Sequence, residues 1–241
     1  MTDMLSTLAS GFGDKALMLV DKDGTPAGHI LGTEMVGAME YEHNKHNRVP
    51  WGYTELAYLE STGTQWIDTG IGSIVNLKTE VVCQQTSLGS GYPTIVGAFE
   101  SSSGYKVIFG YNGAVFYSQC GNGSGYVNLL NYDTAKHTIV VDNGTDSQSI
   151  QIDSQSYTSS YAITTGSNVS VALFARKSYT GTTVNFVSMK LWSAKFYRSG
   201  DIIMNLIPAK RNSDGVVGMY DLVSNTFLTN AGTGTFSYGE L

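Results

Sequence analysis

The stretch Tyr58-Leu-Glu-Ser-Thr-Gly-Thr-Gln-Trp-Ile-Asp-Thr-Gly-Ile71 decides the fold of this chain. Two glycines, Gly63 and Gly70, bracket a short strand within it. Side chains alternate between the two faces of a strand, so Trp66 is predicted to point to one face and Gln65 and Ile67 to the other. The stretch therefore predicts strand, turn and strand at the start of an all-β domain.

The chain after Trp51 continues this period-two pattern, with turn residues at about every 8 to 12 positions, which is typical of a β-sandwich. Asn112-Gly113 and Asn143-Gly144 each stand between two alternating segments. Asn-Gly is favoured in tight hairpin turns, because both positions tolerate positive φ. The alternation changes parity near Trp192-Ser193, and this change predicts a β-bulge there.

Composition limits the classes of function. The chain has 241 residues, of which 14% are charged, and a formal net charge of −6 at neutral pH. Its basic residues are scattered, so we expect neither nucleic-acid binding nor membrane insertion. The length suits one large all-β domain with a small appendage. We predict a boundary between residues 1–50 and 51–241.

Residues 1–50 differ in composition from the rest. Segments 15–20 and 25–31 flank the turn Asp21-Lys22-Asp23-Gly24, and this arrangement predicts a hairpin. Thr33 is a suitable cap for a short helix that ends before Asn44. A hairpin and two helical turns cannot bury a core of their own, so we expect this appendage to pack on the sandwich or on neighbouring subunits.

Cysteine content and the start of the chain bear on its location. Cys83 and Cys120 are the two cysteines, and the sequence leaves open whether they form a bridge or remain buried thiols. The longest early apolar run, residues 16–20, is shorter than the roughly 7 residues that a secretory signal needs. We therefore expect the chain to be made without a signal peptide.

The opening stretch resembles the first motif of a family of concanavalin A-like lectin/glucanase domains, also called LamG-like jelly rolls. Such domains occur in phage structural proteins and in surface proteins of gut bacteria. Three later segments resemble the closing motifs of this family: Leu206-Ile-Pro-Ala-Lys210, Val216-Val-Gly-Met-Tyr-Asp221 and Phe227-Leu-Thr-Asn-Ala-Gly-Thr-Gly-Thr-Phe236. The resemblance spans about residues 55–238. It implies a concanavalin A-like jelly-roll sandwich, in which we expect the start of the domain to pair with its end.

Catalysis is not expected. Glucanases of this fold carry Glu-x-Asp-x-x-Glu on one strand, because retaining hydrolysis needs two carboxylates about 5 to 5.5 Å apart. No glutamate of this chain has an aspartate two positions later, and the nucleophile motif Gly-x-Ser-x-Gly is absent from the sequence. The sequence thus favours a binding or structural role over an enzyme.

Metal ions and cofactors are not expected either. Glu42, His43 and His46 are spaced so that one helical turn can bring them together, but such a stretch is more often a polar helix face or loop. The segment Asp21-Lys22-Asp23-Gly24 departs from a calcium loop, which needs glycine at its sixth position and glutamate at its twelfth. A plain turn is the better interpretation.

Candidate binding residues come from loops rich in tyrosine, serine and glycine. A sugar site needs an aromatic face beside planar hydrogen-bonding groups, and tyrosine-rich loops equally suit protein partners. The sequence does not separate these two kinds of ligand. The candidates are Tyr92, Tyr126, Tyr161, Arg176 and Tyr179.

Two functions remain open. The first is a bacteriophage virion surface protein, such as a head or tail fibre, spike or decoration protein, whose sandwich binds host glycan. The alternative is a purely structural capsid or tail component with no glycan ligand. Under both, we expect synthesis in the cytoplasm of the bacterial host and a final location on the virion surface. We also expect residues 1–50 to bind other virion proteins and the chain to form a homo-oligomer, with a trimer as the specific expectation. A glycan-processing enzyme rests on fold analogy alone.

Overall fold

The computed structural model describes residues 16–20, 26–31, 47–72, 75–87, 91–100, 106–112, 115–121, 127–129, 133–160 and 167–241. This part of the chain contains strands, turns and irregular segments but no helix. Accordingly, none of these residues forms a helix suited to crossing a membrane. The larger of two compact units consists of residues 55–210 and 216–241.

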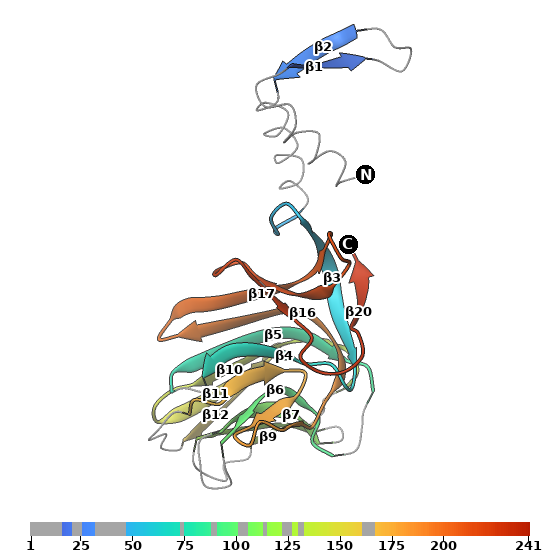
Figure 1. Ribbon diagram of the computed structural model, residues 1–241. Coiled ribbons are helices and arrows are strands. Elements are labelled where there is room, and N and C mark those ends of the chain that lie inside the picture. Colours follow the sequence, from blue (N-terminus) through green and yellow to red (C-terminus); the bar gives the residue numbers. More distant parts are fainter. Residues whose placement is uncertain are drawn as a thin grey trace. The chain divides into compact units, whose positions relative to one another are not determined.

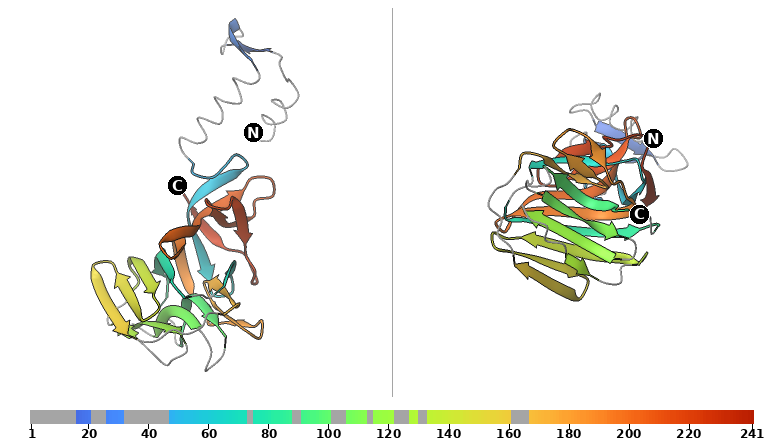
Figure 2. Two further views of the ribbon diagram at one scale, coloured as in Figure 1. Left: turned by 90° about the vertical axis from the view of Figure 1, so that its left-hand side faces the viewer. Right: turned by 90° about the horizontal axis from the view of Figure 1, so that it is seen from below.

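The larger unit contains two stacked sheets (Figures 1 and 2). The ten-stranded sheet has the spatial order β12 (Gln155–Ser160), β11 (Ser147–Ile152), β10 (Lys136–Asn143), β5 (Leu77–Gln85), β16 (Ser188–Arg198), β3 (Tyr53–Thr62), β17 (Asp201–Arg211), β18 (Val217–Asp221), β19 (Thr226–Thr229), with β20 (Ser237–Glu240) on β3. The eight-stranded sheet has the order β15 (Thr183–Val184), β14 (Arg176–Ser178), β6 (Thr94–Phe99), β7 (Lys106–Asn112), β8 (Val115–Gly121), β9 (Val127–Leu129), with β13 (Ser170–Leu173) on β6 and β4 (Ile67–Gly72) on β13.

Strict alternation of side chains builds the core. In β5 every second residue, from Leu77 to Gln85, is buried, whereas the residues between them are partly exposed. The inward-facing residues of both sheets join one apolar cluster, which includes Phe109 and Phe116 from the eight-stranded sheet and Phe196 from the ten-stranded sheet. Each such side chain stabilises the fold by roughly 1.5 to 3 kcal/mol. The two sheets and their shared core confirm the predicted all-β sandwich.

The first and last strands of the sandwich lie side by side, as the sequence predicts. In Figure 1, β20 runs along β3, and the two strands pair antiparallel with Tyr238 opposite Leu59. Just before β4, Gln65 and Ile67 are buried while Trp66 is partly exposed, so the predicted facing of these three residues is also confirmed.

Side-chain amides reinforce this closure between distant parts of the chain. The Gln65 side chain is 3% exposed. It accepts a hydrogen bond from the Thr62 amide at 2.9 Å and donates one to the Thr235 carbonyl at 3.2 Å. Asn230 accepts from the amides of Trp66 at 3.1 Å and Gly232 at 2.8 Å.

Gly232 is required at this closure. A Cβ atom there would lie 2.1 Å from the Thr64 carbonyl oxygen, closer than any side chain tolerates. The glycine-rich closing segment therefore allows two backbones to approach each other directly.

Other sequence-based predictions of pairing hold. β7 pairs antiparallel with β8, and β10 with β11, around the two predicted Asn-Gly sites. The second turn is longer than the two residues expected, because the ladder stops at Asn143 and resumes at Gln148. The register of β16 on β5 shifts between Leu191 and Ser193, which confirms the bulge. Cys83 and Cys120 are buried thiols and are not joined by a disulfide, so the second of the two alternatives left open by the sequence is the one observed.

Near the start of the chain, β1 (Ala16–Val20) and β2 (Pro26–Leu31) pair antiparallel, which confirms the predicted strands of the hairpin. The predicted turn at residues 21–24 and the helix after Thr33 lie outside the described residues. The boundary at residue 50 stays a prediction.

Replacing Gln65 with alanine tests the closure. We expect the Gln65→Ala variant to lose about 2 kcal/mol or more of unfolding free energy, because buried groups that bonded the amide are left unsatisfied. Gln155→Ala, on exposed β12, is the matched control and should change stability by less than about 0.5 kcal/mol. Urea unfolding followed by circular dichroism measures both. Equal, small losses in the two variants would contradict the role given to Gln65.

Candidate functional site

Three of the five candidate residues lie in the described part of the chain. These are Tyr92, Arg176 and Tyr179, whereas Tyr126 and Tyr161 lie outside the described residues. Tyr92 and Tyr179 are among the exposed large side chains of the protein, at 50% and 60% of their surface. Both are therefore available to a ligand.

Strand β6 determines where these three residues lie. Tyr92 stands two residues before β6 begins. Arg176 opens β14, which runs parallel to β6 with Arg176 opposite Gly97. The Tyr179 amide donates to the Phe99 carbonyl at 2.9 Å. The structure thus brings Arg176 and Tyr179 together along the later half of β6 and places Tyr92 at its beginning.

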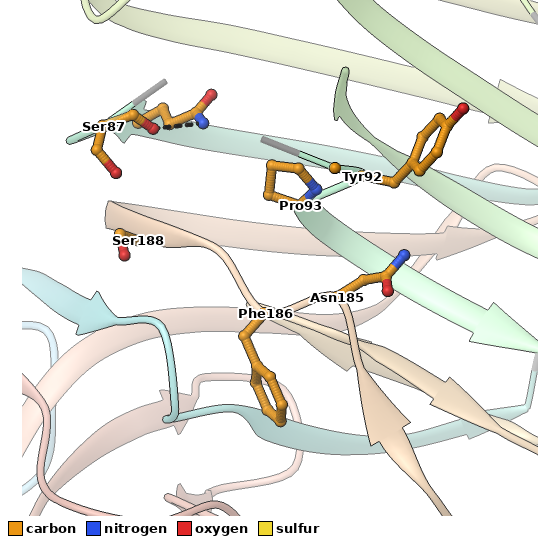
Figure 3. Close-up of a pocket in the computed structure, with 8 residues that line it drawn as sticks. Ser87, Tyr92, Pro93, Asn185, Phe186 and Ser188 are labelled. Carbon is orange, nitrogen blue, oxygen red and sulfur yellow. Dashed lines mark hydrogen bonds between the residues drawn. The ribbon is translucent and has the colours of Figure 1, made fainter. Parts of the chain in front are cut away.

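The first of two hollows, called here the Tyr92 hollow, has a volume of about 230 Å³ (Figure 3). The Tyr92 ring is held edge-on against Tyr117, with ring centroids 5.5 Å apart and planes at 87°. Thr94 Oγ1 donates to the Tyr92 carbonyl at 3.1 Å, so backbone and ring are both supported. The lining residues are Gln85, Ser87, Gly91, Tyr92, Pro93, Asn185, Phe186 and Ser188.

Two amide side chains face this hollow from different strands. Gln85, at the end of β5, is 1% exposed. Its Nε2 donates to the Ser87 carbonyl at 2.6 Å, and its Oε1 is buried without a hydrogen-bond partner. Asn185 adopts a φ of 58°, and its carbonyl accepts from the Thr94 amide at 2.8 Å. In Figure 3 the Asn185 amide points to the side where Tyr92 lies, whereas the Phe186 ring points away.

The chemistry of the Tyr92 hollow suits a small polar ring. An aromatic face can stack on the C–H groups of a sugar, and amides can donate to and accept from its hydroxyl groups. The volume is below the roughly 300 Å³ at which pockets for drug-sized ligands begin. One sugar ring is the size of ligand that matches it.

The second hollow, called here the Tyr179 hollow, has a volume of about 350 Å³. Tyr179 stands on the turn between β14 and β15, where the Gly181 amide donates to the Ser178 carbonyl at 3.0 Å. Gly181 has a φ of +80°, which favours glycine. The other polar lining groups are Glu100, Ser167, Asn168, Ser170, Lys177 and Ser178.

An ion pair supports this second hollow. Lys177 Nζ lies 2.5 Å from Asp68 Oδ2 and donates to Ser170 Oγ at 2.6 Å. Burial raises the pKa of Asp68, but hydrogen bonds from Lys177, Ser170 and the Gly70 amide outweigh it and hold the pKa below its usual value. Asp68 is thus an ionised partner of Lys177 and not a proton donor at neutral pH.

Carboxylates are scarce among the described residues that line the two hollows. Of the described lining residues, Glu100 alone is a carboxylate, so neither hollow is lined by the two carboxylates of a glycosidase. The described residues also contain no group of three or more His, Cys, Asp or Glu placed to hold a metal ion. Glu42, His43 and His46 lie outside the described residues.

The sequence patterns do not identify the side-chain amides of Gln85 and Asn185 as part of a site. Gln85 is one inward residue in an alternating strand, and nothing in the pattern distinguishes it from a core position. Asn185 offers one local signal, because asparagine tolerates positive φ better than most residues. Both become site residues only when β5 and the segment after β15 meet the start of β6.

No family model and no curated protein matches the chain. Among solved structures, it is similar to the CBM40 domain of the Ruminococcus gnavus IT-sialidase bound to α2,3-sialyllactose, with 10% identity, 61% of this chain and 92% of that chain covered, and a TM-score of 0.49. Domains LG4-5 of the mouse laminin α1 chain are 12% identical, with 80% of this chain and 48% of that chain covered and a TM-score of 0.46. The Trypanosoma rangeli sialidase is 10% identical, with 81% of this chain and 35% of that chain covered and a TM-score of 0.41. The chain thus spans about half of the laminin chain and about a third of that sialidase.

The Asp68–Lys177 pair predicts a pH dependence of stability. The pKa of Asp68 is lower in the folded protein than in the unfolded chain, so its contribution is full above about pH 4 and is lost as pH falls through the folded-state pKa. Both partners are partly exposed, so we expect Asp68→Asn to lose up to about 1 kcal/mol at pH 7. Below the folded-state pKa of Asp68 this loss should vanish.

Urea unfolding across this pH range measures the effect, with the exposed Asp201→Asn as control. A loss in Asp68→Asn that stays the same at every pH would contradict the ion pair as its cause.

Proposed function

We propose that this chain is a non-catalytic glycan-binding module whose principal sugar site is the Tyr92 hollow. One observation carries the proposal: an exposed tyrosine ring, fixed edge-on by Tyr117, lies beside the amides of Asn185 and Gln85. Gln85 Oε1, at this hollow, is a buried acceptor whose hydrogen-bonding capacity is unused in the structure. This combination favours a sugar over a purely apolar ligand.

The Tyr179 hollow is the second contact in this proposal. The two hollows lie at opposite ends of β6, which is six residues long. At about 3.3 Å per residue, they are separated by roughly 20 Å. That separation allows one oligosaccharide to contact both hollows. Weak individual sites gain strength when several are engaged together.

The setting of this module is a further part of the proposal. The resemblance of residues 58–71 and of the closing segments to domains of phage structural proteins supports a place on the surface of a bacteriophage virion. There the chain would act as a head or tail fibre, spike or decoration protein that binds host glycan. Residues 1–50 would bind other virion proteins, and a trimer would present several sandwiches to one cell surface.

Substitution of the exposed tyrosines tests glycan binding. We expect the full-length protein to bind a subset of bacterial surface glycans on an array. Tyr92→Ala should weaken the binding of that subset about tenfold, because one stacking contact is lost, and Tyr179→Ala should weaken the binding of longer glycans alone. Tyr157→Ala is the matched control, since Tyr157 is 41% exposed on β12 and lines neither hollow. Its binding should equal that of the unsubstituted protein.

Two outcomes would contradict the proposal. Equal binding by all three variants would place the sugar elsewhere on the surface. The absence of binding to any glycan, in a folded protein that still joins virions, would favour the structural component without a glycan ligand.

A further inference from the structure

Two cationic side chains meet at one aromatic ring on the outer face of the eight-stranded sheet. Arg176 Cζ lies 4.8 Å and Lys106 Nζ lies 5.6 Å from the centroid of the Phe99 ring. The register explains why they meet: Arg176 is opposite Gly97, and Lys106 is opposite Phe99. Residues 97 and 99 of β6 point to the same face, so both cations do as well.

Lys106 is held in an environment that disfavours its charge. Lys106 is 5% exposed. Burial and the neighbouring charge of Arg176 lower the pKa of Lys106. A ring face attracts a cation, but it does not neutralise one, so the repulsion between the two side chains persists.

Arg176 has an unsatisfied hydrogen-bond donor. Its Nε is buried and has no hydrogen-bond partner in the structure. Among the described residues, no carboxylate forms an ion pair with it. Asp68 is paired with Lys177, and Glu100 lines the neighbouring Tyr179 hollow. A guanidinium with a free N–H in a partly buried position is well suited to a planar or tetrahedral anion, which it binds through two parallel hydrogen bonds.

We propose that Arg176 and Lys106 form a subsite for the negative group of an acidic sugar, either a uronate carboxylate or a sulfate ester. The inference rests on the proposed glycan-binding function and specifies its ligand class. Phe99 connects this subsite to the Tyr179 hollow, because its ring contacts both cations and its carbonyl accepts from the Tyr179 amide. Arg176 and Tyr179 thus stand three residues apart on the segment that runs beside β6.

Matched sets of glycans test this subsite on the full-length protein. Each set contains one oligosaccharide in neutral, uronate and 6-sulfated forms, and comparison of the two anionic forms shows which anion is preferred. We expect an anionic form to bind at least tenfold more tightly than the neutral form. Arg176→Gln should remove that difference and leave the affinity for the neutral form unchanged. The exposed Arg198→Gln changes the net charge equally and should keep the full preference.

The outcomes separate this inference from the proposed function. Equal binding of neutral and anionic forms, or a preference that survives in Arg176→Gln, would overturn the anion subsite while glycan binding stands. If the unsubstituted protein binds no form, the proposed function fails and the subsite with it. If circular dichroism shows that Arg176→Gln does not fold, Arg176→Lys and Lys106→Met replace it. A preference undiminished in both would overturn the inference.

Discussion

The hydrogen bonds between the opening segment, residues 64–66, and the closing segment, residues 230–235, are the constraint on which the sandwich depends. They join positions more than 160 residues apart along the chain. Because Gln65 and Asn230 bond to the backbone of the opposite segment and of their own, they fix the relative position of two strand ends. β20 then pairs with β3 and covers backbone groups of β3 that would otherwise be open to pairing with other chains.

The candidate sites follow from the opposite sheet, and above all from β6. This strand is bordered by β7 on one side and by β13 and β14 on the other, so it receives side chains from distant parts of the sequence. At its start, Tyr92 meets Gln85 and Asn185; at its end, Phe99 meets Arg176 and Lys106. Polar and aromatic groups thus gather at the ends of a strand whose other face lies in the apolar core. Rigid strands hold these groups in place, as a binding site requires.

Local patterns predict much of the fold and little of the site. Alternation predicts the strands, Asn-Gly predicts two hairpins, and the parity change near Trp192 predicts the bulge, because each is decided by neighbours in sequence. Gln85 and Lys106 have no such signal. They become notable only through burial beside residues about 70 to 100 positions away, such as Asn185 and Arg176. Tyr92 and Tyr179 were predicted from their loops, but the sequence does not show that β6 separates them.

Sugar contact along β6 and its neighbours is tested most directly by NMR mapping of the backbone amide shifts. The full-length protein, labelled with ¹⁵N, would be titrated with the glycan that it binds best on the array. We expect the largest shifts at residues 91, 92 and 94 and at residues 185–188, with a second group at residues 176–181. Shifts confined to β10, β11 and β12, or no shifts at saturating glycan, would contradict this expectation.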